Sequence, residues 1–197
     1  MDQHPAIRPC RLYCPARFAP SNETRGAARV APLVAPPVPI RGVETPEQQF
    51  WQILDLRGLV VYDAGAFNGL LTLLFARQSS QVICYEPNPQ NRIRLSENIT
   101  LKGVENVRVR DVGVGSQPQN LKTPALKYEI RMTALDIELC HAALPRPDFI
   151  KIDIEGWEIE ALRGGRNTLT TCRPALFLEM HGETVNEKKR KVMEIVA

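Results

Sequence analysis

The stretch LVVYDAGAFNGLLTLLFA, residues 59–76, constrains the fold of this chain more than any other part of it. It begins with a short apolar, β-branched run of the kind found in buried parallel strands. Asp63 ends that run, Gly65 and Gly69 bracket a tight turn, and the last seven residues predict a helix. A strand, a glycine turn and a helix in this order predict a ligand site at the carboxyl edge of an α/β sheet.

An acidic residue follows the turn at the spacing that nucleoside cofactors require. Glu86 comes 21 residues after Gly65 and ends a second apolar strand, residues 81–85. About 20 residues is the interval at which an acidic side chain meets a ribose hydroxyl in such folds. Together, the turn and Glu86 predict a nucleoside cofactor.

The spacing within the turn distinguishes one cofactor from another. A dinucleotide-binding turn reads G-x-G-x-x-G, so that a pyrophosphate can bind at the helix N-terminus, whereas here the turn reads Gly-Ala-Phe-Asn-Gly. Asp63 precedes it, and a carboxylate there would repel a pyrophosphate but suits an ammonium and a sulfonium. S-adenosylmethionine (SAM) carries both, and glycines that serve only packing are the alternative. We predict a SAM site formed by Asp63, Gly65, Ala66, Asn68 and Gly69.

A second informative stretch, DFIKIDIEGWEIEAL, covers residues 148–162. Residues 149–154 predict a strand with Lys151 and Asp153 on one face. Asp153 and Glu155 lie where this strand gives way to a helix, and two crowded carboxylates are costly unless they face a cation or a polar ligand. We predict that both belong to the active site. The alternative is a solvated strand end in which Glu155 favours a helix N-terminus.

Two further strand ends supply candidates. Asp111, near the end of a strand predicted over residues 104–114, is placed to reach an adenine amino group, or else is a turn residue. His181 follows a fifth strand, residues 174–180, and is either a general base near neutral pH or a turn residue. Between them, residues 115–147 predict a short added hairpin and a helical turn or two.

Residues 1–42 differ in composition from the rest of the chain. They carry 8 of the 16 prolines and show no sustained helical or strand period, so we expect a disordered or extended arm before a domain over residues 43–197. The arm has six Arg against Asp2 and Glu23, a net charge of +4, which leaves −1 for the remainder of the +3 chain. A nucleic-acid-binding domain would carry a basic track of its own, so no nucleic-acid partner is expected.

Neither a targeting signal nor a metal site is predicted. The arm lacks the continuous apolar stretch of a signal peptide, and no segment is long enough to cross a membrane, so we expect a cytoplasmic protein without membrane contact. Cys10 and Cys14 have the spacing of two radical-SAM cluster ligands, but Arg17 occupies the place of the third cysteine.

Five segments follow one another in an order that resembles the successive motifs of FkbM-type SAM-dependent methyltransferases. They are DAGAFNGLLT, VICYEPNP, MTALDIEL, IKIDIEGWEIEALRGG and PALFLEMHG, and the match spans about residues 47–182. The resemblance implies a Rossmann-like α/β fold, with a mostly parallel central sheet flanked by helices. It also implies O-methylation of a hydroxyl on a sugar, glycan or natural product. Carried over, Asp63, Gly65 and Gly69 form the methionine-side loop, Glu86 holds the ribose, Asp111 lies by the adenine, and Asp153 and Glu155 lie beside the methyl group.

The chain departs from this family in two ways. The family's turn usually reads Gly-Ala-Asn-x-Gly, whereas Phe67 takes the Asn place here and Asn68 comes one residue later. The family also adds two C-terminal strands after the helix at which this chain stops, so we expect an exposed sheet edge that a partner could cover.

The mechanism implied is an in-line displacement in which the acceptor hydroxyl attacks the SAM methyl group. Positioning would supply most of the catalysis, and Asp153, Glu155 or His181 would take the hydroxyl proton. Three alternatives remain open: a non-catalytic or truncated SAM-binding module, a methyltransferase acting on nucleic acid or protein, and a NAD-linked oxidoreductase. The missing third glycine argues against the last of these.

Overall fold

A computed structural model of the chain describes residues 50–51, 53–122, 128–180 and 185–196. The chain divides into two units, residues 1–55 and 56–197. In the first unit, Phe50 and Trp51 lie in a helical turn with their rings edge to face, 4.9 Å between centroids. The predicted arm lies outside the described residues, so the limits of the arm and of the domain stay a prediction.

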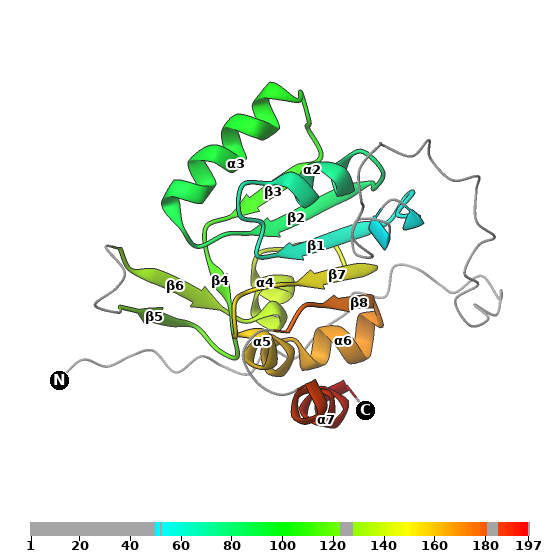
Figure 1. The fold of residues 1–197 in the computed structure, drawn as a ribbon, viewed down its shortest axis with the longest axis vertical. Coiled ribbons are helices and arrows are strands. Elements are labelled where there is room, and N and C mark those ends of the chain that lie inside the picture. The colour runs from blue at the N-terminus through cyan, green and yellow to red at the C-terminus, as the bar shows by residue number, and fades with distance from the viewer. Residues whose placement is uncertain (1–49, 52, 123–127, 181–184, 197) are drawn as a thin grey trace. The chain divides into compact units, whose positions relative to one another are not determined.

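The second unit alternates strands and helices, as Figure 1 shows. Along the chain the elements are β1 (Val60–Ala64), α2 (Leu70–Ala76), β2 (Gln81–Tyr85), α3 (Pro89–Leu101), β3 (Val107–Arg110), β4 (Gly113–Val114), β5 (Gln119–Leu121), β6 (Ile130–Thr133), α4 (Leu135–His141), β7 (Phe149–Ile152), α5 (Glu158–Gly164), α6 (Arg166–Cys172), β8 (Ala175–Leu178) and α7 (Val185–Val196). The α/β class predicted from the alternating pattern is therefore confirmed.

The central sheet has five parallel strands in the order β3-β2-β1-β7-β8. From β1 the chain adds β2 and β3 on one side, and later adds β7 and β8 on the other. This reversal between β1 and β7 is a topological switch point, and open α/β sheets bind ligands outside the carboxyl ends of the strands at such a point. The Rossmann-like sheet implied by the family resemblance is confirmed.

Helices cover both faces of the central sheet because right-handed crossovers on the two sides of β1 lie on opposite faces. On one face, Phe75 of α2 packs edge to face on Phe149 of β7, with 6.1 Å between ring centroids. On the other face, Tyr62 and Tyr85 join Leu162 of α5 in the main hydrophobic core. Loops, and not helices, lie at the carboxyl edge of the sheet. The candidate site residues lie in these loops and at the strand ends beside them.

The strand predicted over residues 104–114 is wrong in one respect, because it is broken in two. β3 ends at Arg110 and forms the edge of the central sheet, whereas β4 pairs with β6 in a separate sheet of order β4-β6-β5. Gly113 packs closely against β6, since a Cβ there would lie 2.5 Å from the Met132 sulfur. The predicted hairpin is confirmed by the antiparallel pairing of β5 with β6.

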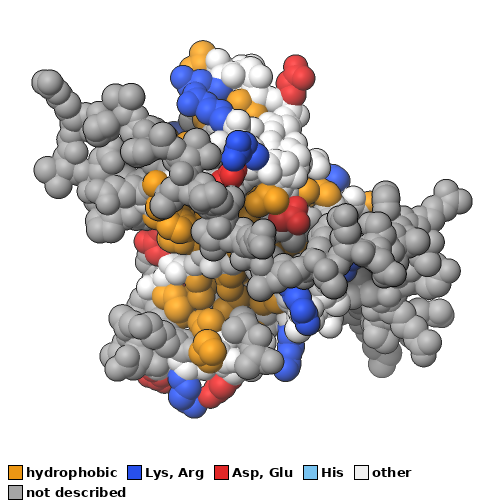
Figure 2. Space-filling view, turned by 90° about the vertical axis from the view of Figure 1, so that its right-hand side faces the viewer, with side chains coloured by type: hydrophobic (Ala, Val, Ile, Leu, Met, Phe, Trp, Pro, Cys, Tyr) orange, Lys and Arg blue, Asp and Glu red, His pale blue; other side chains and the backbone are white. Residues whose placement is uncertain are grey.

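Surface charge is mixed on the face drawn in Figure 2. Its coloured Lys and Arg side chains stand in separate groups with Asp and Glu side chains nearby, and hydrophobic side chains lie between them. No continuous basic track crosses the described part of this face. Within the parts of the chain that the structure describes, no helix has the length and apolar character needed to span a bilayer.

Two core tyrosines on neighbouring strands provide a matched test of the packing. The Tyr62 hydroxyl donates a hydrogen bond to the Pro145 carbonyl at 2.8 Å, whereas the buried Tyr85 hydroxyl has no hydrogen-bond partner among the described residues. Burial raises the pKa of both phenols well above the usual value, so both hydroxyls keep their protons at neutral pH.

We expect Tyr62→Phe to lower the free energy of unfolding by about 1 kcal/mol, because it removes a hydrogen bond and leaves a carbonyl unpaired. Tyr85→Phe should be neutral or stabilising, because it removes a buried hydroxyl that lacks a partner. Urea unfolding of the ligand-free protein, followed by circular dichroism, measures both. Equal losses in the two variants would contradict the unpaired state of Tyr85.

Candidate active site

The glycine turn between β1 and α2 is pressed against the end of β7. Gly65 has φ +87° and Gly69 has φ +90°, a backbone region that side chains rarely adopt. A Cβ on Gly65 would lie 1.8 Å from the backbone oxygen of Asp153. The protein's own backbone therefore already requires glycine at this position.

The backbone N–H groups at the start of the turn are used within the protein. Those of Gly65 and Ala66 donate to the Tyr85 carbonyl at 3.0 and 3.1 Å, and that of Phe67 donates to Glu86 Oε2 at 2.8 Å. A turn that binds a pyrophosphate offers such donors to the ligand. This turn does not, which agrees with the argument against a dinucleotide that its glycine spacing provides.

Glu86 joins three segments at the end of β2. Besides Phe67, its carboxylate accepts hydrogen bonds from the Asn88 backbone N–H at 2.9 Å and from Asn91 Nδ2 at 3.3 Å. The residue is only 5% exposed. The carboxylate is thus fixed beside the glycine turn and the start of α3, and its predicted contact with a ribose stays a prediction.

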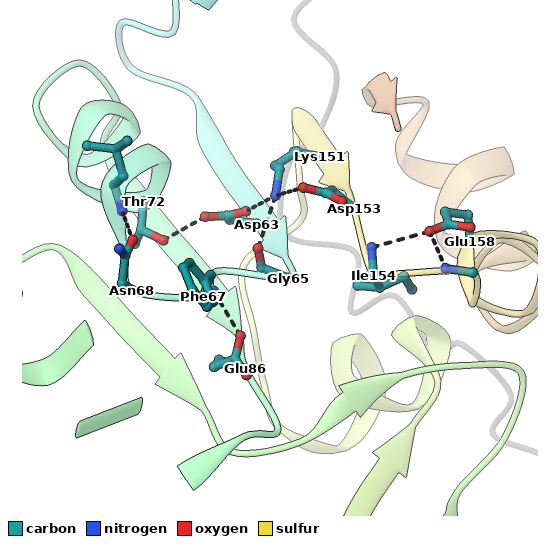
Figure 3. A network of polar contacts seen from close by, with 12 residues as sticks. Asp63, Gly65, Phe67, Asn68, Thr72, Glu86, Lys151, Asp153, Ile154 and Glu158 are labelled. Carbon is teal, nitrogen blue, oxygen red and sulfur yellow. Dashed lines mark hydrogen bonds and ion pairs between the residues drawn. The ribbon is translucent and has the colours of Figure 1, made fainter. Parts of the chain in front are cut away.

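A buried lysine connects the ends of β1 and β7, as Figure 3 shows. Lys151 Nζ lies 3.3 Å from Asp63 Oδ1 and 3.4 Å from Asp153 Oδ2, and it donates to the Gly65 carbonyl at 3.0 Å. The other Asp63 oxygen accepts a hydrogen bond from the Thr72 hydroxyl at 2.6 Å. One ammonium therefore holds both aspartates and the glycine turn together.

Asp63 is fully buried, and its carboxylate meets the ammonium of Lys151. Its predicted part in binding the cationic groups of a cofactor stays a prediction. The sequence analysis did not include Lys151 among the site residues. A lysine inside an apolar strand was the available signal, because Lys is almost never fully buried without a paired charge.

The loop after β7 holds Glu155 in an unusual backbone conformation. Glu155 has φ +55° and Gly156 has φ +102°, and strain of this kind concentrates at functional sites. Glu158, which is 1% exposed, fixes the loop by accepting hydrogen bonds from the backbone N–H groups of Gly156 at 2.8 Å and Ile154 at 3.4 Å. Glu158 is a second residue that the sequence analysis missed.

A cavity of about 380 Å³ opens at this edge of the sheet. Its lining is largely apolar and comes from the turn, the two loops and the small sheet: Gly65, Tyr85, Pro87, Gly113, Val114, Leu121, Ile130, Met132, Ile154, Glu155 and Trp157. Of the predicted site residues, Gly65 and Glu155 line it. Glu155 supplies the carboxylate in an otherwise hydrophobic wall.

Other predicted residues have local structural partners. Asp111 is about half exposed and forms an ion pair with Arg131 of β6, and it does not line the cavity. The Asn68 side chain accepts a hydrogen bond from the Leu70 backbone N–H at 3.3 Å, at the start of α2. His181 lies outside the described residues. Within those residues, no group of three or more His, Cys, Asp or Glu side chains could hold a metal ion.

The glycine at position 65 can be tested against another glycine with positive φ. Gly65→Ala should prevent stable folding, or cost more than 3 kcal/mol, since the new methyl would overlap the Asp153 carbonyl. Gly103→Ala is the control, because Gly103 has φ +61° but nothing within 4 Å of an added Cβ. It should cost only about 1 kcal/mol. Urea midpoints measure both, and similar midpoints would refute the close approach of β7.

Two glutamates of α5 test how the Glu155 loop is held. Glu158→Gln should lower the free energy of unfolding by about 1–3 kcal/mol, because a buried charged acceptor of two backbone N–H groups is lost. Glu160→Gln removes a surface ion pair with Arg163 and should change stability by less than 1 kcal/mol. Equal thermal shifts in the two variants would contradict this role of Glu158.

Comparison of the sequence with known proteins identifies relatives of this chain. The family model described as the methyltransferase FkbM domain matches residues 63–196. Hexuronic acid methyltransferase AglP from Haloferax volcanii is 27% identical over 162 residues, which are 68% of this chain and 67% of that protein.

Solved structures share the fold. The FkbM methyltransferase from Methylobacillus flagellatus aligns with a TM-score of 0.53 and 22% identity over 61% of this chain, which spans 32% of that protein's length. The Streptococcus mutans protein SMU.1697c, solved in complex with S-adenosylhomocysteine (SAH), aligns with a TM-score of 0.52 and 14% identity, over 79% of this chain and 82% of that one. The fold and the family match agree with the resemblance seen in the five motifs, and the chain belongs to the methyltransferase FkbM domain family.

Proposed function

We propose that this chain binds SAM and transfers its methyl group to a hydroxyl oxygen of a small-molecule or glycan acceptor. The observation that carries the proposal is the glycine turn at the switch point of the sheet. Its first N–H groups are used internally, and carboxylates and an apolar cavity surround it. These features suit a cofactor with a cationic end and a purine end better than one with a pyrophosphate.

The residues around the cavity fit the parts of SAM. Pro87, Met132 and Trp157 offer apolar and aromatic surface of the kind that purine rings and methylene groups bury. Glu86 lies beside the turn as the candidate ribose partner. Asp63, Gly65, Ala66, Asn68 and Gly69 remain our proposed methionine-side site, and Asp111 remains the proposed adenine neighbour.

Three residues are our candidates for taking the acceptor proton. When bound, SAM supplies an electrophilic methyl group on a positively charged sulfur. Glu155 is the first candidate because it lines the cavity. Asp153 ranks second, because its ion pair with Lys151 makes its carboxylate a weaker proton acceptor. His181, outside the described residues, is the third. The accepting group would take the hydroxyl proton as the C–O bond forms and the C–S bond breaks.

A sugar hydroxyl is the acceptor that we favour. The support is the likeness to AglP, a hexuronic acid methyltransferase. Glu155 in an apolar wall provides one group that could orient a hydroxyl, and Trp157 provides an aromatic surface against which the apolar face of a sugar ring could pack.

Isothermal titration with SAM, SAH and NAD tests the cofactor. We expect SAM and SAH to bind and NAD not to bind. Glu86→Ala should weaken SAM binding by about 1–3 kcal/mol, the usual effect of losing a charged hydrogen-bond partner. Glu97→Ala, on the exposed surface of α3, should leave SAM binding unchanged. Circular dichroism melting checks that both variants fold. NAD binding without SAM binding would refute the proposal.

Turnover then separates an enzyme from a binding module. The protein is incubated with SAM carrying a labelled methyl group and with a panel of neutral and acidic sugars. Methyl transfer to a hydroxyl oxygen, located by mass spectrometry, is the expected result. SAM binding with no transfer to any acceptor would favour a non-catalytic role.

A further inference from the structure

Two different sheets contribute to the lining of the cavity. Some lining residues lie at or just after the carboxyl ends of β1, β2 and β7 in the central sheet, among them Gly65 and Glu155. Others are side chains of the β5–β6 hairpin, namely Leu121, Ile130 and Met132. Figure 1 shows β5 and β6 on the side toward which the central strands point. The hairpin therefore forms a wall of the cavity that is separate from the central sheet.

The face of the hairpin that lines the cavity is apolar. Leu121 and Ile130 are directly opposite each other in the antiparallel pairing, so their side chains lie on the same face. Met132 shares this face because it is two residues from Ile130. Asn120 and Arg131, the next opposed pair, lie on the other face and are exposed. The hairpin thus turns an apolar face to the cavity and a polar face to solvent.

The three apolar side chains differ in how far they are already packed. Met132 is 7% exposed, and its sulfur and methyl carbon would lie 2.5 and 3.2 Å from a Cβ added to Gly113, so it fills the space between the hairpin and β4. Leu121 and Ile130 are only partly buried, and within the described residues β5 pairs with β6 alone. Their remaining apolar surface lies at the rim of the cavity, where a ligand can bury it.

The rim is the part of the cavity that an acceptor would meet. A volume of about 380 Å³ is close to the lower end of the range for pockets that hold one ligand, so a bound cofactor would occupy most of it. The cofactor contacts that we propose at Gly65 and Glu86 follow β1 and β2 directly. Glu155, the first candidate for taking the acceptor proton, lines the cavity and is exposed, which favours a reacting hydroxyl at the rim.

We propose that Leu121 and Ile130 form an acceptor-binding wall, which selects a hydroxyl compound with an apolar group beside the methylated hydroxyl, such as an alkyl or aryl glycoside. This inference rests on the proposed methyl transfer to a hydroxyl oxygen. Two opposed aliphatic side chains offer no hydrogen bond, so they recognise an acceptor through the apolar area that it buries. Each methylene group fully buried against them raises the affinity by about fourfold, and a free sugar gains little from such a wall.

Alkyl glucosides of increasing chain length measure the wall directly. Methyl, propyl and pentyl β-D-glucosides share one sugar and differ only in methylene groups, and each is titrated calorimetrically into the protein saturated with SAH. We expect the affinity to rise by about two- to fourfold per methylene, without displacement of SAH. The proposal is overturned by an affinity that does not rise with chain length, including the case in which none of the glucosides binds. Displacement of SAH also contradicts it, because the wall would then hold the cofactor.

Substitutions on the two faces of the hairpin test which residues form the wall. In the double variant Leu121→Thr with Ile130→Thr, β-branched side chains keep the strand preference but place hydroxyl groups in the wall. The gain per methylene should then fall below about 1.5-fold, and Leu121→Thr alone, which leaves β6 intact, should give an intermediate gain. Asn120→Thr makes the same kind of change on the outer face and should keep the wild-type gain.

All three variants should bind SAH with the wild-type affinity, which also shows that they are folded. An equal gain per methylene in the wild type, in Leu121→Thr and in the double variant would mean that the alkyl chain binds elsewhere, and the acceptor-binding wall would be wrong.

Failure of this inference differs from failure of the proposed function. If the wild-type protein binds neither SAM nor SAH, the proposed cofactor is wrong and the inference falls with it. If the wild-type protein binds both and methylates a sugar hydroxyl in the turnover assay, but shows no gain with chain length, the acceptor-binding wall alone is refuted.

Discussion

The ion pair between Lys151 and Asp63 is the interaction on which the rest of the site depends. Burying a lysine and an aspartate costs several kcal/mol per ion, and the cost is recovered only when geometry and further hydrogen bonds are good. Here the ammonium also reaches Asp153 and the Gly65 carbonyl, while Thr72 supports the far side of Asp63. Because its partners come from the ends of two strands and from the turn between β1 and α2, the pair fixes the relative positions of these segments.

Glutamates hold the surrounding loops by binding backbone N–H groups. Glu86 accepts from Phe67 in the glycine turn, and Glu158 accepts from Gly156 in the loop after β7. Both carboxylates are almost fully buried, so each ties its loop to the end of the sheet by hydrogen bonds that water does not compete for. A site whose loops are already held in this way loses little conformational entropy when a ligand binds.

The parts of the fold set by local pattern could be predicted from sequence, and the parts set by distant pairing could not. The turn at Gly65, the helix after Asn88 and the acidic end of β2 follow from neighbouring residues. The function of Lys151 depends on β1 pairing with a strand almost ninety residues later. Likewise, Asp111 meets Arg131 because β6 pairs with β4, which begins two residues after Asp111. The sequence analysis missed Glu158 because a single glutamate in a helix is expected to be solvent-exposed. Only the position of the loop after β7 shows that it is buried.

The approach of the Asp153 carbonyl to Gly65 divides the turn into positions that can and cannot accept a side chain. Position 65 is closed to every side chain by the scaffold itself. Position 67 is open, because Glu86 holds its backbone N–H and leaves its side chain, 56% exposed in Phe67, outside the packing. At φ +52° a phenylalanine costs about 1 kcal/mol relative to an extended or right-handed backbone. Substitutions at position 67 should therefore be tolerated without any change in the sheet beneath, whereas substitutions at position 65 should not.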